Sequence, residues 1–188
     1  MQVYKDLKIL SARPLKKDYQ KIKHHLYGFL SAKKNFSSGD WLRLTKQKIL
    51  DIRNRKKIPI LVGGTGLYFK ALTEGLVNIP NIPIKFRKEV RSLYKKLGSK
   101  KFYSKLTKLD PLVKNKINPY DVHRSIRAYE VKSFTKKSMY DWFKNTKSTF
   151  ERNDFCKIYI EFPRERLIKR INARAEDMIN KGAILEVK

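Results

Sequence analysis

Residues 58–72 read IPILVGGTGLYFKAL, and the rest of the chain is organised around them. The apolar, β-branched run at 58–62 is bounded by glycines, which is typical of a strand buried on both faces of a parallel sheet. The following glycines let the backbone approach a ligand, and a helix is expected from Leu67 to near Gly75. Thr65 would then lie between a strand and a helix N-terminus, where open α/β sheets bind ligands. Similar turns without ligands are common, so the loop alone leaves both interpretations open.

The composition points to a polyanionic partner. The chain has 188 residues, with 45 Lys+Arg against 17 Asp+Glu and a net charge of +28. This length suits one domain with a core, or a core plus a small appendage. A lysine-rich solvated surface is the alternative, but the interleaving of Arg, Tyr and Phe with the lysines favours nucleic acid.

Several classes of protein are disfavoured by the sequence. The single cysteine, Cys156, lies at the edge of a predicted strand, so we expect a small core residue with no disulfide and no metal cluster. The adjacent His24 and His25 have no ligand-spaced partner that would indicate zinc. No apolar run reaches the length of a membrane helix, and no signal peptide opens the chain. We therefore expect a cytoplasmic protein with no membrane partner.

The central part of the sequence reads as an inserted helical lobe. A turn-rich linker at 78–83 contains two prolines, which exclude a helix. Beyond it the periodicity predicts helices at 84–97, 100–109, 121–134 and 139–145, with basic residues crowding the first. The predicted organisation is a core domain formed by residues 1–77 and 149–188, interrupted by a basic insertion at 78–148.

The core domain should contain further helices and a second strand. A helix entered at 36–40 and running to about Arg55 has an apolar stripe of Trp41, Leu44, Ile49 and Ile52. Alternation at 157–161 predicts a strand that returns the chain to the sheet. Pro163 then opens a helix whose buried stripe is expected to be Leu167, Ile171 and Met178.

Two arginine-bearing patterns could contact an anion. Arg166, Arg170 and Arg174 recur every four residues, and either a polyanion or the nearby carboxylates Glu165, Glu176 and Asp177 would offset their mutual repulsion. Residues 118–131 read NPYDVHRSIRAYEV, with Asp121 as N-cap and Val122, Ile126 and Tyr129 toward the core. His123 and Arg127 lie at i, i+4 beside Arg124, which offers a ridge for phosphates or a base edge; a generic basic helix face is the alternative.

Four segments in this order resemble the tRNA dimethylallyltransferases, or tRNA isopentenyltransferases, of the IPP transferase family. They are MQVY followed by SARP, the VGGTGLYFKAL run, the NPYDVHRSIRAYEV run, and the pattern R-I-x-x-R-x-x-x-M-x-x-x-G-x-x-x-E from Arg170 to Glu186. The resemblance implies an α/β fold: a P-loop-NTPase-like parallel sheet core, incomplete here, with an inserted basic helical lobe. It also implies transfer of a dimethylallyl group from dimethylallyl diphosphate to N6 of the adenosine 3′ of the anticodon, after that base is flipped out of its stack.

The resemblance carries roles over to individual residues. Catalytic roles fall on Thr65, toward the adenosine, and Arg174, toward the leaving diphosphate. Arg170 joins Arg174 in diphosphate binding, because a guanidinium binds phosphate oxygens bidentately. The implied tRNA contacts are Met1, Gln2, Thr65, Arg87, His123, Arg124, Ser125, Ile126 and Arg127. The implied partners are the tRNA anticodon stem-loop and dimethylallyl diphosphate, with Mg²⁺ as cofactor and a monomeric protein.

The sequence also departs from the family pattern. Ahead of the MQVY segment the family carries a strand, a P-loop and an Asp-Ser pair whose Asp is the base, and beyond Glu186 it continues further. We therefore expect a member shortened at both ends, without the P-loop, the base or the Mg²⁺ ligands. The alternatives are a non-catalytic tRNA-binding remnant of the family and, less in keeping with the basic lobe, a relative of the nucleotide kinases.

Overall fold

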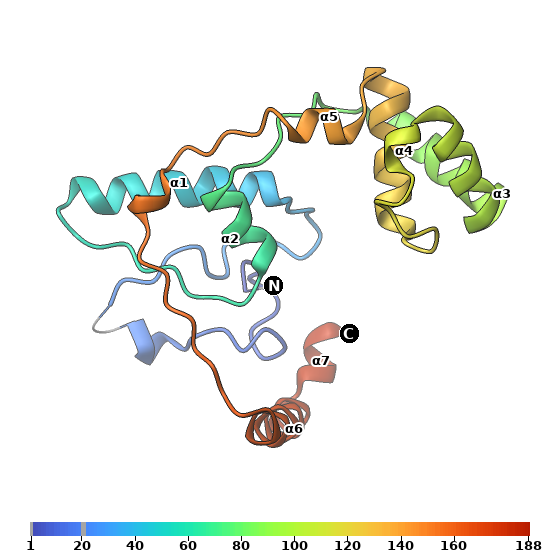
Figure 1. Ribbon diagram of the computed structural model, residues 1–188. Coiled ribbons are helices and arrows are strands. Elements are labelled where there is room, and N and C mark those ends of the chain that lie inside the picture. The colour runs from blue at the N-terminus through green and yellow to red at the C-terminus, as the bar shows by residue number, and fades with distance from the viewer. Residues whose placement is uncertain (1, 20–21) are drawn as a thin grey trace. The chain divides into compact units, whose positions relative to one another are not determined.

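The computed structural model describes residues 2–19 and 22–188, and its regular elements are helices (Figure 1). In chain order these are η1 (Lys16–Tyr19), α1 (Ser38–Asn54), α2 (Gly66–Thr73), α3 (Ile84–Leu109), η2 (Pro111–Val113), α4 (Val122–Thr135), α5 (Met139–Phe143), η3 (Arg152–Asp154), α6 (Arg164–Asn180) and α7 (Ala183–Val187). No described helix is both long and apolar enough to cross a membrane.

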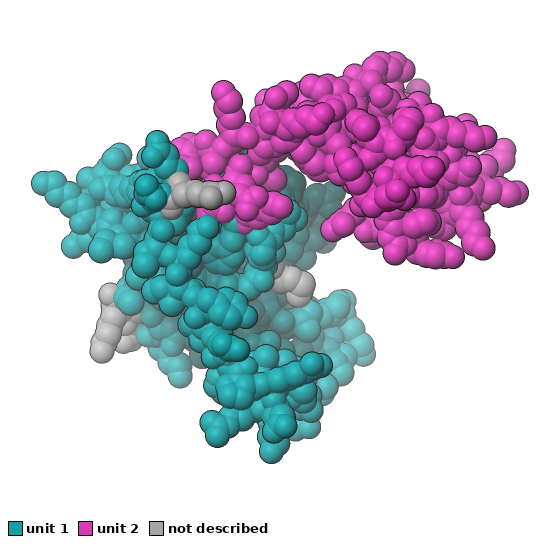
Figure 2. Space-filling model, viewed as in Figure 1, with its two compact units in different colours: residues 1–69, 151–188 teal, residues 70–150 magenta. Residues whose placement is uncertain are grey.

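The chain forms two compact units (Figure 2). Unit 1 comprises residues 1–69 and 151–188, and unit 2 comprises residues 70–150. The predicted insertion at 78–148 lies wholly inside unit 2.

The predicted P-loop-NTPase-like parallel sheet is wrong for this structure. Among the described residues, β pairing is confined to one isolated parallel bridge between Tyr4 and Leu30. The segments expected as strands, 58–62 and 157–161, are irregular. A strand is completed by hydrogen bonds to a neighbouring strand, and apolar alternation in the sequence cannot supply that neighbour.

The side chains of these two segments confirm that no sheet buries them. Ile60 is 79% exposed and Tyr159 is 89% exposed. Cys156, predicted to be a small core residue, is also exposed. A strand inside a parallel sheet would have both faces covered. Both segments are apolar as the strand prediction requires, but the structure leaves their side chains exposed to solvent.

Helix α1 of unit 1 is confirmed close to its predicted bounds. Ser37 caps it, because the Ser37 hydroxyl accepts from the Asp40 amide at 3.1 Å while the Asp40 carboxylate accepts from the Ser37 amide at 3.2 Å. This reciprocal capping box satisfies amides at the helix start. The buried stripe is Leu42, Thr45 and Ile49, so of the four predicted stripe residues only Ile49 is fully buried.

Helix α2 follows the glycine-rich loop, as predicted. The Thr65 carbonyl accepts the amides of Tyr68 and Phe69, at 3.0 and 3.3 Å, and so starts the helix. Tyr68 stacks on Trp41 of α1, with ring centroids 4.5 Å apart and planes 9° apart. After the helix, Gly75 has φ +92°, the left-handed conformation expected of a glycine that ends a helix.

Unit 2 is built around α3, α4 and η2. Its core joins Ile82, Leu106, Val113, Ile117, Ala128, Val131 and Met139. Helix α3 is interrupted at Gly98, where φ is +72°, and this kink falls where the sequence predicted the gap between two helices. The chain enters and leaves the unit side by side, since Ser148 Oγ donates to the Leu72 carbonyl at 3.0 Å.

Helix α4 is confirmed, but its buried face differs from the prediction. Asp121 caps it by accepting the Arg124 amide at 3.0 Å. The fully buried apolar positions are Ala128 and Val131, while Tyr129 lies partly buried against Phe102 with ring centroids 5.1 Å apart. The predicted stripe of Val122, Ile126 and Tyr129 is therefore only half-buried.

Helix α6 of unit 1 follows Pro163, as predicted, but its expected buried stripe is wrong. Leu167 and Ile171 are exposed and Met178 is half-buried, and α6 has no fully buried residue. Helix α7 is held differently. The carboxylate of Glu186 accepts the backbone amides of Lys8, Ile9 and Leu10, which ties the C-terminal helix to the N-terminal loop.

Candidate nucleic-acid interface

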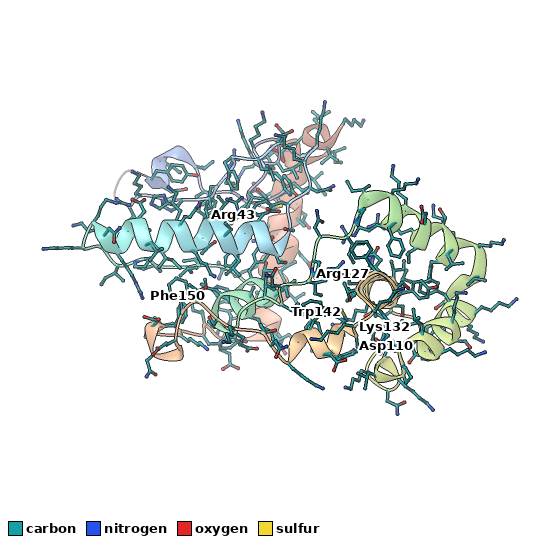
Figure 3. All side chains as sticks on the ribbon, turned by 90° about the horizontal axis from the view of Figure 1, so that it is seen from above. Arg43, Asp110, Arg127, Lys132, Trp142 and Phe150 are labelled. Atoms are coloured by element: carbon teal, nitrogen blue, oxygen red, sulfur yellow. The ribbon has the colours of Figure 1, made fainter. Side chains whose placement is uncertain are left out.

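The best-defined basic site lies in unit 2, where α3 and α4 pack against each other. Arg87 on α3 and Arg127 on α4 both bind the carboxylate of Glu130, which is 2% exposed. The Arg87 Nε lies 3.3 Å from Glu130 Oε2, and the Arg127 Nη1 lies 3.4 Å from the same oxygen. Figure 3 labels Arg127 on α4. One buried carboxylate thus links two arginines that the sequence assigned separately to tRNA.

Both arginines keep part of their side chain in solvent. The Arg87 side chain is 41% exposed and that of Arg127 is 35% exposed. A guanidinium carries several N–H donors in a planar fork, and among the described residues neither arginine donates a side-chain hydrogen bond to any group except Glu130. The remaining donors are available to an anion outside the protein.

His123 and Arg124 lie on the first turn of the same helix and are exposed. The Arg124 Nε lies 3.4 Å from Asp121 Oδ2, and its side chain is 73% exposed. An ion pair so open to solvent is weak, so a phosphate could replace Asp121 as the partner of Arg124. Asp121 then serves both as helix cap and as a resting partner for this guanidinium.

The other predicted tRNA contacts of α4 are less accessible. Ile126 is half-buried. Ser125 is 1% exposed, and its hydroxyl has no hydrogen-bond partner among the described residues. Ser125 therefore presents no side chain at the surface in this structure, unlike His123 and Arg124 on the same turn.

The predicted adenosine site belongs to unit 1. Thr65 is exposed at the start of α2, where helix amides are not yet used by the helix. Gln2 donates its side-chain amide to the carbonyls of Ser11 and Ala12, at 3.2 and 3.0 Å, so it fixes the N-terminal loop. Met1 lies outside the described residues.

The predicted diphosphate site is also in unit 1, on α6. Arg170 and Arg174 are exposed. Arg170 lies over the ring of Phe162, with 5.1 Å between guanidinium carbon and ring centroid. Within the described part of the chain, no hydrogen bond or ion pair joins Arg174 to Thr65.

Among residues 2–19 and 22–188, no group of three His, Cys, Asp or Glu side chains is placed to hold a metal ion. Mg²⁺ commonly binds through only one or two carboxylates together with substrate phosphates, so the Mg²⁺ implied by the resemblance stays a prediction.

Sequence reasoning missed the partners of two carboxylates, Glu130 in unit 2 and Glu186 in unit 1. Glu130 was inside the NPYDVHRSIRAYEV segment, three residues after Arg127, and an isolated acid in a basic helix is the signal that could have found it. Glu186 ends the last matched pattern, but nothing near it in sequence names its partners, which are about 177 residues away.

The comparisons with known proteins agree on one family. The family model described as IPP transferase matches residues 2–188. The chain is 60% identical over 188 residues to a tRNA dimethylallyltransferase of Pelagibacter ubique, covering 100% of this chain and 60% of that protein. It is 42% identical to one of Rickettsia massiliae, covering 100% of this chain and 52% of that protein.

Solved structures show the same likeness. A eukaryotic dimethylallyltransferase acting on tRNA superposes with a TM-score of 0.81 at 28% identity, covering 99% of this chain and 46% of that one. A tRNA isopentenylpyrophosphate transferase from Staphylococcus epidermidis gives a TM-score of 0.57 at 30% identity, covering 100% and 61%. The chain spans about half to three-fifths of the length of these relatives. It belongs to the IPP transferase family.

Proposed function

We propose that this chain takes part in transferring a dimethylallyl group from dimethylallyl diphosphate to N6 of the adenosine 3′ of the anticodon in tRNA. Membership of the IPP transferase family over residues 2–188 is the observation that carries this proposal. The relatives named above are tRNA dimethylallyltransferases. We further propose that the protein acts as a monomer in the cytoplasm on the anticodon stem-loop.

In this proposal the two units have different roles, tRNA binding in unit 2 and the transfer reaction in unit 1. Unit 2 supplies the tRNA-binding surface, through Arg87 and Arg127 at Glu130 and through the exposed His123 and Arg124. Phosphate contacts of this kind fix the position of the RNA and make binding salt-dependent. The net charge of +28 supports this role, because a polyanion reduces the self-repulsion of so basic a chain.

Unit 1 carries the chemistry in this proposal. The N6 nitrogen forms a bond to the allylic carbon while the bond from that carbon to the diphosphate oxygen breaks. The N6 proton must pass to a general base, a role that this proposal assigns to none of residues 1–188, and the diphosphate leaves with the electron pair of the broken bond. Thr65 contacts the adenosine, and Arg174, with Arg170, offsets the negative charge that grows on the leaving oxygen.

The test is prenyl transfer by the whole chain to unmodified tRNA, with isotope-labelled dimethylallyl diphosphate and Mg²⁺. The control RNA has guanosine in place of the adenosine 3′ of the anticodon. Label retained by the adenosine RNA alone supports the proposal. Salt-sensitive binding of both RNAs without transfer would indicate instead the tRNA-binding remnant that the sequence left open. Absence of binding would overturn both.

Two substitutions separate the roles within unit 1. Thr65→Val removes the hydroxyl at nearly constant volume, so a fall in transfer without a change in stability supports the adenosine contact. Arg174→Gln should lower kcat by about a hundredfold, the usual cost of losing one electrostatic stabiliser. Arg166→Gln, on the same ridge two turns earlier, is the matched control and should leave kcat near that of the unchanged chain.

A further inference from the structure

Glu130 is a buried acid that pairs with two arginines. Its side chain is 2% exposed, although it lies on a helix whose exposed face carries cations. Its oxygen Oε2 receives Arg87 from α3 and Arg127 from its own helix, at 3.3 and 3.4 Å. The carboxylate therefore links α3 to α4, because it pairs with one arginine from each helix.

Stability alone does not explain this arrangement. Taking a carboxylate out of water is costly, and replacing a buried ion pair by apolar groups of similar volume is often neutral or stabilising. The distances of 3.3 and 3.4 Å are longer than those of the strongest charge-assisted hydrogen bonds. A role in fixing the geometry of the two guanidiniums accounts better for the position of Glu130.

The charge balance of the cluster specifies what it can bind. Two guanidiniums and one carboxylate leave a net charge of one positive unit, carried by groups that remain partly in solvent. A phosphodiester has one negative charge and two free oxygens, so it neutralises the cluster and can accept from both forks. Arginines held by a buried partner also lose less side-chain freedom on binding than free ones.

We propose that Glu130 is a positioning residue that holds Arg87 and Arg127 as one two-guanidinium site for a single phosphodiester of the RNA backbone. This inference rests on the proposed function, because it assumes that unit 2 grips tRNA. It assigns a role to Glu130, and it treats the two arginines as one binding site whose contributions to the binding free energy are coupled.

The sign of one substitution distinguishes positioning from plain electrostatics. Glu130→Gln removes a negative charge from a surface that faces a polyanion, so an electrostatic role alone predicts tighter RNA binding. A positioning role predicts weaker binding, by about tenfold, because both charge-assisted contacts become disordered. The dependence of binding on salt should also become shallower, as for a protein that neutralises fewer phosphates.

Glu89 provides a matched control. It lies on α3 two residues after Arg87, is exposed, and makes no ion pair with any described residue. Glu89→Gln removes the same charge from the same unit without touching the cluster. We expect it to tighten RNA binding by up to about twofold, the opposite direction from Glu130→Gln.

Non-additivity provides the second readout. If Glu130 acts through Arg87, then Arg87→Gln should weaken binding much less in the Glu130→Gln background than in the unchanged chain. Glu130→Asp keeps the negative charge on a side chain that is one methylene shorter. Its affinity for RNA should therefore lie between those of Glu130→Gln and the unchanged chain. If Glu130 only supported the fold, Glu130→Gln would weaken RNA binding by the same factor with or without Arg87. The coupling described here would then be absent.

The measurement is binding of the whole chain to an anticodon stem-loop RNA over a salt series, with circular dichroism as the check on folding. If Glu130→Gln fails to fold, Glu130→Met replaces it, because an apolar side chain of similar length removes the buried charge. Weaker binding with a shallower salt slope and coupling to Arg87 supports the proposal. Binding as tight as that of Glu89→Gln overturns it and leaves the proposed function standing. Salt-insensitive or undetectable binding by the unchanged chain overturns both.

Discussion

Ile9 donates its backbone N–H to both carboxylate oxygens of Glu186, at 2.9 and 3.0 Å, across 177 residues of sequence. The amides of Lys8 and Leu10 bind the same carboxylate. Three consecutive amides directed at one anion form a nest of the kind that binds phosphates in other proteins. Here the anion is supplied by the chain itself, so the contact fastens α7 to the N-terminal loop.

Glu186→Gln should therefore destabilise unit 1. The amide keeps one acceptor oxygen but loses the charge, so we expect a loss of about 1 kcal/mol in the free energy of unfolding, the usual net worth of such a bond. Denaturant unfolding at pH 7 measures this. Glu176→Gln, an exposed site on α6, is the control and should change the free energy little.

The same contact predicts a pH dependence. Burial by itself would raise the pKa of Glu186, but the hydrogen bonds from Leu10, Ile9 and Lys8 outweigh it and lower the pKa below its usual 4.5. A lowered folded-state pKa gives stability that is present above the unfolded value and is lost as the pH falls through the folded value. The difference between the unchanged chain and Glu186→Gln should thus shrink below about pH 4. A difference that grows in acid would contradict this.

Gly75→Ala should destabilise unit 2 strongly. At φ +92° a side chain is strained, and an added Cβ would also collide with the Lys147 carbonyl. Gly98→Ala isolates the strain, because Gly98 has φ +72° but no atom within 4 Å of the added Cβ. We expect about 1 kcal/mol for Gly98→Ala and clearly more for Gly75→Ala in thermal unfolding. Equal costs would show that the Lys147 contact is absent in solution.

Ser37→Ala should remove the cap of α1 at a cost of about 1 kcal/mol. The side-chain hydrogen bond from Ser37 is the largest cause of the lowered pKa of Asp40. That pKa should therefore rise toward its usual 3.8 in the variant, which an NMR titration detects. Ser38→Ala is the control, because Ser38 makes no capping bond among the described contacts. An unmoved Asp40 pKa in Ser37→Ala would refute the hydrogen bond that the Ser37 hydroxyl donates to the Asp40 carboxylate at 2.6 Å.

Trp41→Leu should disturb the loop that carries Thr65. Tyr68 stacks on Trp41 three residues after Thr65, and burial, followed by the nearby Tyr4, raises the pKa of Tyr68 above 10.0. Without the indole, that pKa should fall toward 10.0 in a spectrophotometric titration, and prenyl transfer should weaken by about tenfold. Tyr68→Phe keeps the stack and should retain transfer; a parallel loss there would assign the effect to the hydroxyl.

Helix positions could be predicted from the sequence because helix bonds are local. The break at Gly98, the cap at Asp121 and the start of α6 after Pro163 each depend on residues within one or two turns. The family could also be identified from the sequence, because the four segments that resemble it are short and occur in the same order along the chain. That residues 78–148 form a separate inserted lobe stays a prediction.

The sheet and the buried faces could not be predicted in this way. Apolar alternation at 58–62 and 157–161 indicates a preference for strand, but a strand exists only with a neighbour, and the described residues provide none. The predictions of the buried faces of α4 and α6 were wrong for a related reason. Which side of a helix is buried depends on what packs against it, as the burial of Ser125 in place of Ile126 shows.

The sequence by itself determined the helix positions and the family of this protein, because both depend on residues that are neighbours in the chain. Only the tertiary structure decided that Glu130 links Arg87 to Arg127 and that Glu186 closes on the amides at residues 8–10. Those contacts join residues 43 and about 177 positions apart. An ion pair or hydrogen bond forms only between groups that are close in space, and folding is what brings these distant residues together.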